Sequence, residues 1–125
     1  MARNPIFLVT FILWVFSNQS LWAQNASDGK KTYALYCSGC HGVSGKGDGP
    51  LGSALPVKPA NHTDGAAMNR LSDDWLLEII SKGGGSVEKS PAMPAWGGQL
   101  QEKQIRDLIS YIRSLAVPPY QPSRK

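Results

Sequence analysis

The chain has 125 residues, with 13 basic and 9 acidic side chains and a formal net charge of +4. This length suits one domain but is marginal for a large hydrophobic core. The basic residues are scattered and form no stripe, so the sequence has no electrostatic signature of nucleic-acid binding. The scattered basic residues include Lys30, Lys31, Lys46, Lys58, Lys82 and Lys89.

The N-terminal segment has the pattern of a secretory signal peptide. A positive charge at Arg3 precedes an apolar run over residues 6–16, and Ala23 is a small residue before the expected cut. Spanning a bilayer as a helix takes about 20 apolar residues, so the run is short for a permanent anchor. We therefore expect residues 1–23 to be a signal peptide removed on export, and residues 24–125 to form the mature domain. Leu21 is large for its place in a cleavage site, so a membrane-tethered form is the alternative.

The first helix is predicted to begin at Ser27 as N-cap and to run through Tyr33 into Cys37–His41, a Cys-x-x-Cys-His segment that we call the attachment motif. This arrangement fastens a haem covalently to protein. Thiols three positions apart lie on the same side of one helical turn, so Cys37 and Cys40 can each bind a haem vinyl group. His41 then lies under the iron as proximal ligand. The motif predicts one covalently bound haem c.

Three other interpretations of the motif compete with haem attachment. A thioredoxin-like redox pair requires alternating strands and helices, and the sequence has no convincing strand pattern. Cys37, Cys40, His41 and His62 are the right residue types to bind zinc. Structural zinc sites, however, combine Cys-x-x-Cys with two spaced histidines, and the adjacent Cys40 and His41 do not fit that spacing. A structural disulfide would leave His41 unexplained.

Residues 42–71 are rich in glycine and proline and have no sustained periodicity. So long an irregular segment is unusual in a small domain, but extended chain can wrap a flat apolar ring. Leu51, Leu55 and Val57 are the candidate wall residues of that ring site. The next helix is predicted to begin at N-cap Ser72 and to stop at Gly83. Its expected buried stripe is Trp75, Leu76, Ile79 and Ile80.

The segment 90–96 reads SPAMPAW and places Met93 between prolines, in a loop that is not regular helix. The flanking prolines restrict the backbone, which favours presentation of the thioether to the iron. Met93 is therefore our candidate for the distal ligand. Met68, in a short helical stretch, fits core packing better, and His62 is the other alternative.

The last helix is predicted from about Gln101 to Leu115, followed by Pro118 and Pro119, and it should pack on the first helix. Its apolar residues recur at helical spacing: Ile105, Leu108, Ile109, Ile112 and Leu115. The predicted fold class is all-α, with three main helices around the haem and long irregular loops.

The residues Gly29, Tyr33 and the attachment motif, together with Leu108 and Tyr111, resemble the class I c-type cytochromes, small monohaem electron carriers of the bacterial periplasm. The resemblance covers nearly all of residues 24–125. It implies that the first and last helices cross, with the glycine allowing close approach and the aromatic rings filling the crossing.

Further implications of the resemblance concern the loops. Residues 45–50 are similar to a subgroup also found in haem subunits of larger oxidoreductases, and the match implies that the Pro50 carbonyl accepts a hydrogen bond from the second ring nitrogen of His41. Gln101 stands where the family often has Ser or Thr, so the last helix could begin elsewhere or fray. No residue is assigned to the haem propionates; the candidates are Trp75, Trp96, Asn61 and Arg70.

The sequence thus predicts a periplasmic, non-enzymatic electron carrier with a haem held by Cys37 and Cys40 and ligated by His41 and Met93. Filled axial positions keep substrates from the iron. The expected partners are redox proteins, either for a free shuttle or for a cytochrome subunit of a membrane-associated complex. The alternative is a haem enzyme or a gas or peroxide sensor whose Met93 bond is labile.

Overall fold

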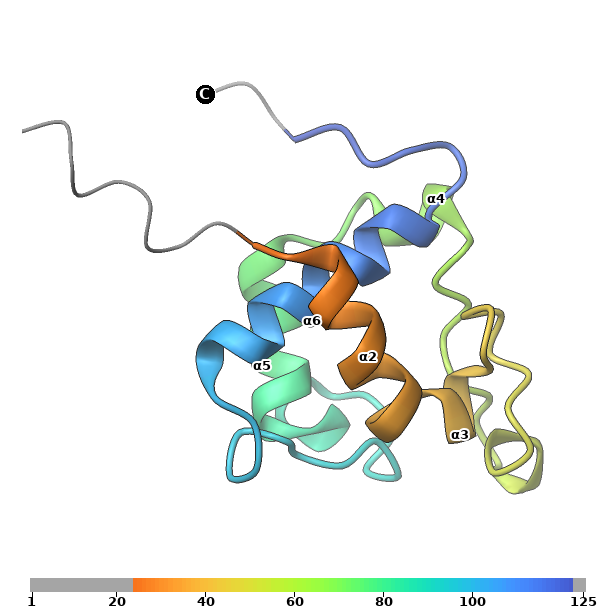
Figure 1. Cartoon of the computed structure of the whole chain (residues 1–125). Helices are drawn as coiled ribbons and strands as arrows, with labels where there is room; N and C mark the ends of the chain where they lie inside the picture. The colour runs from red at the N-terminus through yellow and green to blue at the C-terminus, as the bar shows by residue number, and fades with distance from the viewer. Residues whose placement is uncertain (1–23, 123–125) are drawn as a thin grey trace, which may run out of the picture.

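Helices α2, α5 and α6 form the body of the molecule, and the shorter α3 and α4 lie on loops at its edge (Figure 1). The computed structural model describes residues 24–122, so the predicted signal peptide lies outside the described residues. The α-helices are α2 (Ala26–Tyr36), α3 (Ser38–His41), α4 (Gly65–Met68), α5 (Asp73–Lys82) and α6 (Glu102–Leu115); the 3₁₀ helices are η1 (Gly52–Ala54) and η2 (Gly84–Val87).

The all-α prediction is confirmed. Within residues 24–122, the only β-type pairing is an isolated bridge between Asp64 and Val117, and no named strand is present. The same residues include no helix that is long and apolar enough to cross a membrane. The three main helices correspond to the three that the sequence predicts.

Helices α2 and α6 cross closely because Gly29 faces the backbone of α6. A Cβ atom at position 29 would overlap the carbonyl oxygen of Asp107. Leu108 is fully buried at this crossing, and Tyr33 packs edge-on against Tyr111 with ring centroids 5.2 Å apart. Aromatic pairs favour this arrangement. The glycine and aromatic roles expected from the family resemblance are therefore confirmed.

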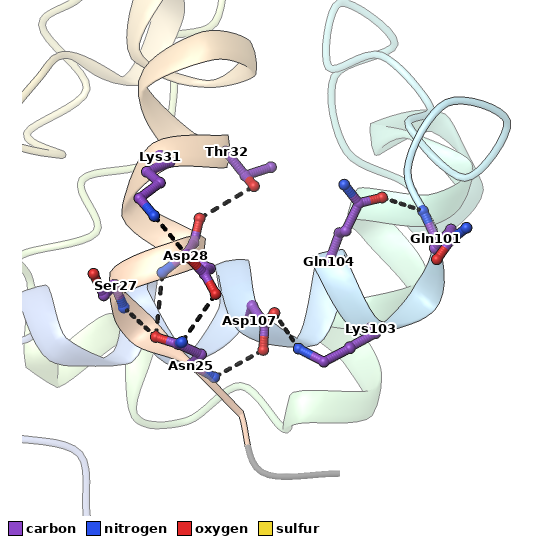
Figure 2. A network of polar contacts seen from close by, with 9 residues as sticks. All are labelled: Asn25, Ser27, Asp28, Lys31, Thr32, Gln101, Lys103, Gln104 and Asp107. Carbon is purple, nitrogen blue, oxygen red and sulfur yellow. Dashed lines mark hydrogen bonds and ion pairs between the residues drawn. The ribbon is translucent and has the colours of Figure 1, made fainter. Parts of the chain in front are cut away.

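The beginning of α2 differs from the prediction. Asn25, and not Ser27, is the N-cap: its side-chain oxygen accepts from the backbone N–H groups of Ser27 at 3.0 Å and Asp28 at 3.3 Å (Figure 2). Asparagine caps helices at least as well as serine, so the earlier residue takes the position. The backbone N–H of Asn25 also donates to the buried carboxylate of Asp107 at 2.8 Å, which ties this end of α2 to α6.

Helix α5 has the predicted ends. The Ser72 hydroxyl accepts from the backbone N–H of Trp75 at 3.1 Å, and Gly83 follows the last helical residue. Leu76 and Ile80 are buried, while Trp75 and Ile79 are half-buried, because this stripe lies at the edge of the core. Acidic residues in the first turn complement the helix dipole.

Helix α6 begins at Glu102 with Gln101 as its N-cap, so the absence of serine or threonine does not displace its start. The side chain of Gln104 accepts from the backbone N–H of Gln101 at 2.9 Å, which satisfies one donor at the helix start (Figure 2). On this helix Ile105, Leu108, Ile109 and Ile112 are buried, as their spacing predicts.

Arg113 joins the end of α6 to the connection between α4 and α5, and sequence periodicity gave no sign of this. Its guanidinium donates to the carbonyls of Met68 at 2.8 Å and Leu71 at 2.6 Å and pairs with Asp73. The Arg113 side chain is only 8% exposed, and Tyr120 covers it at 3.9 Å from the ring centroid. Buried guanidinium is tolerated because nearly all of its donors have partners.

Candidate haem site

The attachment motif forms its own helical turn. Helix α2 ends at Tyr36, Cys37 lies between the two helices, and α3 covers the rest of the motif. The prediction of one continuous helix was therefore wrong in this detail, although Cys40 and His41 both donate backbone N–H groups to the carbonyl of Cys37, at 3.3 and 2.9 Å. A single turn still connects both cysteines to His41.

The glycine-rich loop, residues 42–52, is fastened to the carbonyl end of α3. The backbone N–H groups of Gly47, Gly49 and Leu51 donate to the carbonyls of His41 at 2.7 Å, Cys40 at 3.1 Å and Gly39 at 2.9 Å. Helix C-termini leave such carbonyls without partners inside the helix, so the loop satisfies them. Gly42 begins the loop at φ 83°, in a region that side chains rarely adopt, which explains the glycine there.

His41 is held by a backbone carbonyl that the sequence did not indicate. Its Nδ1–H donates to the oxygen of Ala60 at 3.0 Å, which leaves Nε2 as the nitrogen with a free lone pair. The expectation that the Pro50 carbonyl accepts this hydrogen bond was wrong. Pro50 lies in the turn that leads into η1, where its carbonyl accepts from the hydroxyl of Ser53 at 2.8 Å.

His62 stacks on His41, with ring centroids 4.3 Å apart and planes inclined by 17°. Two rings packed face to face are poorly placed to approach one iron from opposite sides, which argues against His62 as distal ligand. Burial, and secondarily the neighbouring His41, lower the pKa of His62 to about 3, and burial also lowers the pKa of His41. Both imidazoles are therefore neutral near pH 7, the form in which histidine binds metals.

The two cysteines are free, and Cys37 is buried. Burial, with a smaller contribution from Cys40, raises the pKa of the Cys37 thiol to about 12. Redox cysteines of the thioredoxin type have a lowered pKa instead, so this environment contradicts that interpretation. Among residues 24–122, no three His, Cys, Asp or Glu side chains gather in a metal-binding cluster, which contradicts the zinc alternative.

The Met93 loop, residues 84–97, is fastened to the end of α5. Trp96 donates its backbone N–H to the carbonyl of Ile80 in α5 at 2.9 Å, and within the loop Gly84 donates to the carbonyl of Met93 at 3.0 Å. The Met93 side chain is half-buried against the core. Met68 is 3% exposed on α4 and belongs to the core, as its helical context predicted.

An aromatic pair connects the Met93 loop to the attachment motif. Tyr36, the last residue of α2, lies against Trp96 with ring centroids 5.2 Å apart. In Figure 1, α3 and the cyan segment after η2 lie at the same end of the molecule. The fold thus brings the loop with the candidate distal ligand close to the motif with the candidate proximal ligand.

The donor set at this end of the molecule fits a haem. Two thiols, a neutral imidazole with an available Nε2 and a half-buried thioether belong to adjacent segments. Leu51 and Val57 are 66% and 61% exposed, and Leu55 is half-buried, so this loop offers apolar surface for a flat ring. A Cβ atom at Gly39 would lie 3.0 Å from Leu51, which places that leucine against the motif.

Sequence reasoning missed Ala60 and the relation between the two histidines. Neither has a periodic signal, because both depend on how residues 53–62 return to α3. The only signal was that His62 is the one other histidine in the chain.

Known proteins share this sequence and this fold. Residues 26–116 match the cytochrome c family. The chain is 34% identical over 90 residues to the cbb3-type cytochrome c oxidase subunit FixP of Azorhizobium caulinodans, a match covering 72% of this chain but 27% of that protein. It is 30% identical to cytochrome c6 of a Synechococcus strain, covering 84% of this chain and 81% of that protein.

The solved structure of the KustC0563 c-type cytochrome is similar, with a TM-score of 0.59 and 26% identity over 71% of this chain and 98% of that chain. The family match covers most of the chain, and Cys37, Cys40 and His41 fit the haem attachment pattern. The chain therefore belongs to the cytochrome c family, whose domain carries covalently bound haem c.

Proposed function

We propose that this protein is a periplasmic electron carrier in which Cys37 and Cys40 hold one haem c by thioethers and His41 and Met93 are its axial ligands. The observation that carries the proposal is the orientation of His41. Its Nδ1–H donates to the carbonyl of Ala60, so the lone pair of Nε2 is available to iron. When bound, haem c supplies a one-electron redox couple.

The protein's own contribution is to keep the site closed and rigid. His41 ends α3, whose carbonyls accept hydrogen bonds from the glycine-rich loop, and Met93 lies in a loop that is hydrogen-bonded to the end of α5. Two fixed protein ligands exclude substrates from the iron and limit structural change between oxidation states. A thioether ligand also favours the ferrous form and raises the reduction potential relative to two histidines. These properties support electron transfer rather than catalysis.

Redox proteins are the proposed partners. Because the relatives include subunits of cbb3-type cytochrome c oxidase, a place in a larger oxidoreductase complex is the second form of this proposal. Residues 1–23, as a signal peptide, would deliver the chain to the periplasm. Co-purification from a native membrane extract separates a complex subunit from a free shuttle.

Absorption spectra of the matured protein, oxidised and reduced and with CO added to the reduced form, test the proposal. We expect a low-spin c-type spectrum that CO does not change. Ready CO binding would contradict closed His/Met ligation and would favour the alternative of a haem enzyme or gas sensor.

The substitution Met93→Ala tests directly whether Met93 is the distal ligand. We expect the haem to stay attached, CO to bind, and the reduction potential to fall by on the order of 0.1 V, within the range of about 0.8 V that axial ligands control. Met68→Leu is the matched control, because Met68 is buried in the core and a similar volume should leave the spectrum unchanged. An unchanged spectrum and potential in Met93→Ala would rule out Met93.

A further inference from the structure

His41 has two contacts that together fix the plane of its ring. The hydrogen bond from Nδ1 to Ala60 orients one edge of the imidazole. A ring held only at one edge can still rock about that bond. His62 covers the face of the ring at a centroid distance of 4.3 Å and an inclination of 17°, which removes this freedom. The family match does not account for this second contact.

His62 is itself held by two different segments. Its backbone N–H donates to the carbonyl of Gly45 at 2.6 Å, and its Nδ1 lies 3.2 Å from the hydroxyl of Tyr33. The His62 residue is 8% exposed. A buried imidazole with both its backbone and its ring fixed is suited to act as a rigid support.

Tyr33 connects this support to the α2–α6 crossing. It is 1% exposed, packs edge-on against Tyr111, and lies one turn after Gly29 on α2. A phenylalanine would fill the same space, so packing alone does not require the hydroxyl. Its contact with His62 gives the hydroxyl a role at the site.

We propose that His62 is a positioning residue that sets the ring plane of His41, and that the Tyr33 hydroxyl holds His62 in that position. This inference rests on the proposed function, since it takes His41 as the axial ligand. The contacts form one path from the helix crossing to the ligand: Tyr111 to Tyr33, Tyr33 to His62, and His62 to His41. The buried helix crossing thereby orients the ligand of the haem iron.

Electron paramagnetic resonance of the oxidised, haem-loaded full chain tests the proposal, because the g values of low-spin ferric haem depend on the planes of its axial ligands. In His62→Ala we expect the low-field line to broaden and shift, since His41 loses its single orientation. In His62→Phe, an aromatic face remains and the line should stay sharp. Covalent attachment should persist in both variants.

Tyr33→Phe and Tyr111→Phe form a matched pair, because each removes one hydroxyl from the same aromatic contact. Only Tyr33 lies within hydrogen-bonding distance of His62. We expect the low-field resonance line to broaden in Tyr33→Phe and to stay as in the unmutated protein in Tyr111→Phe. This pair decides the question if His62→Ala does not fold.

The outcomes separate this inference from the proposed function. Suppose that His62→Ala and Tyr33→Phe both keep the low-field resonance line of the unmutated protein and a normal His/Met absorption spectrum. This result would overturn the positioning role and leave the electron-carrier proposal intact. If the spectrum of the unmutated protein showed that no histidine binds the iron, both the positioning role and the proposed function would be overturned. Equal broadening in His62→Ala and His62→Phe would also contradict a role for the stacked face.

Discussion

The α2–α6 crossing and the loops around α3 are held together by different kinds of contact. At the crossing, buried side chains pack on one another, and Gly29 lets the two helix backbones approach. Around α3, backbone N–H groups of the glycine-rich loop bind the carbonyls of the attachment motif. Side-chain packing therefore specifies the scaffold, while backbone hydrogen bonds shape the site. Substitutions should have distinct consequences in the two regions.

The largest effect is expected from Gly29→Ala, which tests the scaffold. The new Cβ atom overlaps the carbonyl of Asp107, so α2 and α6 must separate, and we expect a loss of about 3 kcal/mol in unfolding free energy. Gly98→Ala is the control, because no atom lies within 4 Å of its added Cβ. Denaturant unfolding monitored by circular dichroism measures both. Similar stability of the two variants would contradict the close crossing.

Arg113→Met tests a part of the scaffold away from α3, because this α6 side chain binds carbonyls at the end of α4 and in the connection to α5. Removing the guanidinium leaves the carbonyls of Met68 and Leu71 without these donors, and we expect a loss of about 2 kcal/mol with an unchanged haem spectrum. Arg106→Met, which breaks a more exposed pair with Glu102, should cost less than about 1 kcal/mol. A changed spectrum in Arg113→Met would show that scaffold and site are less separate than proposed.

The smallest effect concerns the start of α2. Asn25→Ala should lower the unfolding free energy by about 1 kcal/mol, because it removes the side chain that caps the helix. Ser27→Ala should be close to neutral, since no side-chain cap bond comes from Ser27. Thermal unfolding of the two variants side by side measures the difference. If Ser27→Ala were the less stable of the two variants, the result would support Ser27 as the N-cap, as the sequence predicted.

The same division explains what could be predicted from the sequence. Helices α5 and α6 were predicted closely because their signals are local: Ser72 caps, Gly83 ends a helix, and isoleucines and leucines recur at helical spacing. The attachment motif identified the cofactor, since its chemistry lies within five consecutive residues.

The missed features depend on contacts between distant residues. Ala60 binds His41 across 19 positions, and Arg113 reaches Met68 across 45. Neither pair has a periodicity or a composition that marks it. Pro50 was a reasonable acceptor by resemblance, but the turn before η1 directs its carbonyl to Ser53 instead.

Burial of Cys37 also bears on how the protein is assembled. In the folded chain Cys37 is only 8% exposed, and Tyr36 beside it is covered on one side by Trp96. An enzyme that joins haem to both cysteines needs access to both sulfur atoms, and the folded chain buries Cys37 and half-buries Cys40. We therefore expect attachment to precede complete folding around Cys37, so that maturation works on an open chain.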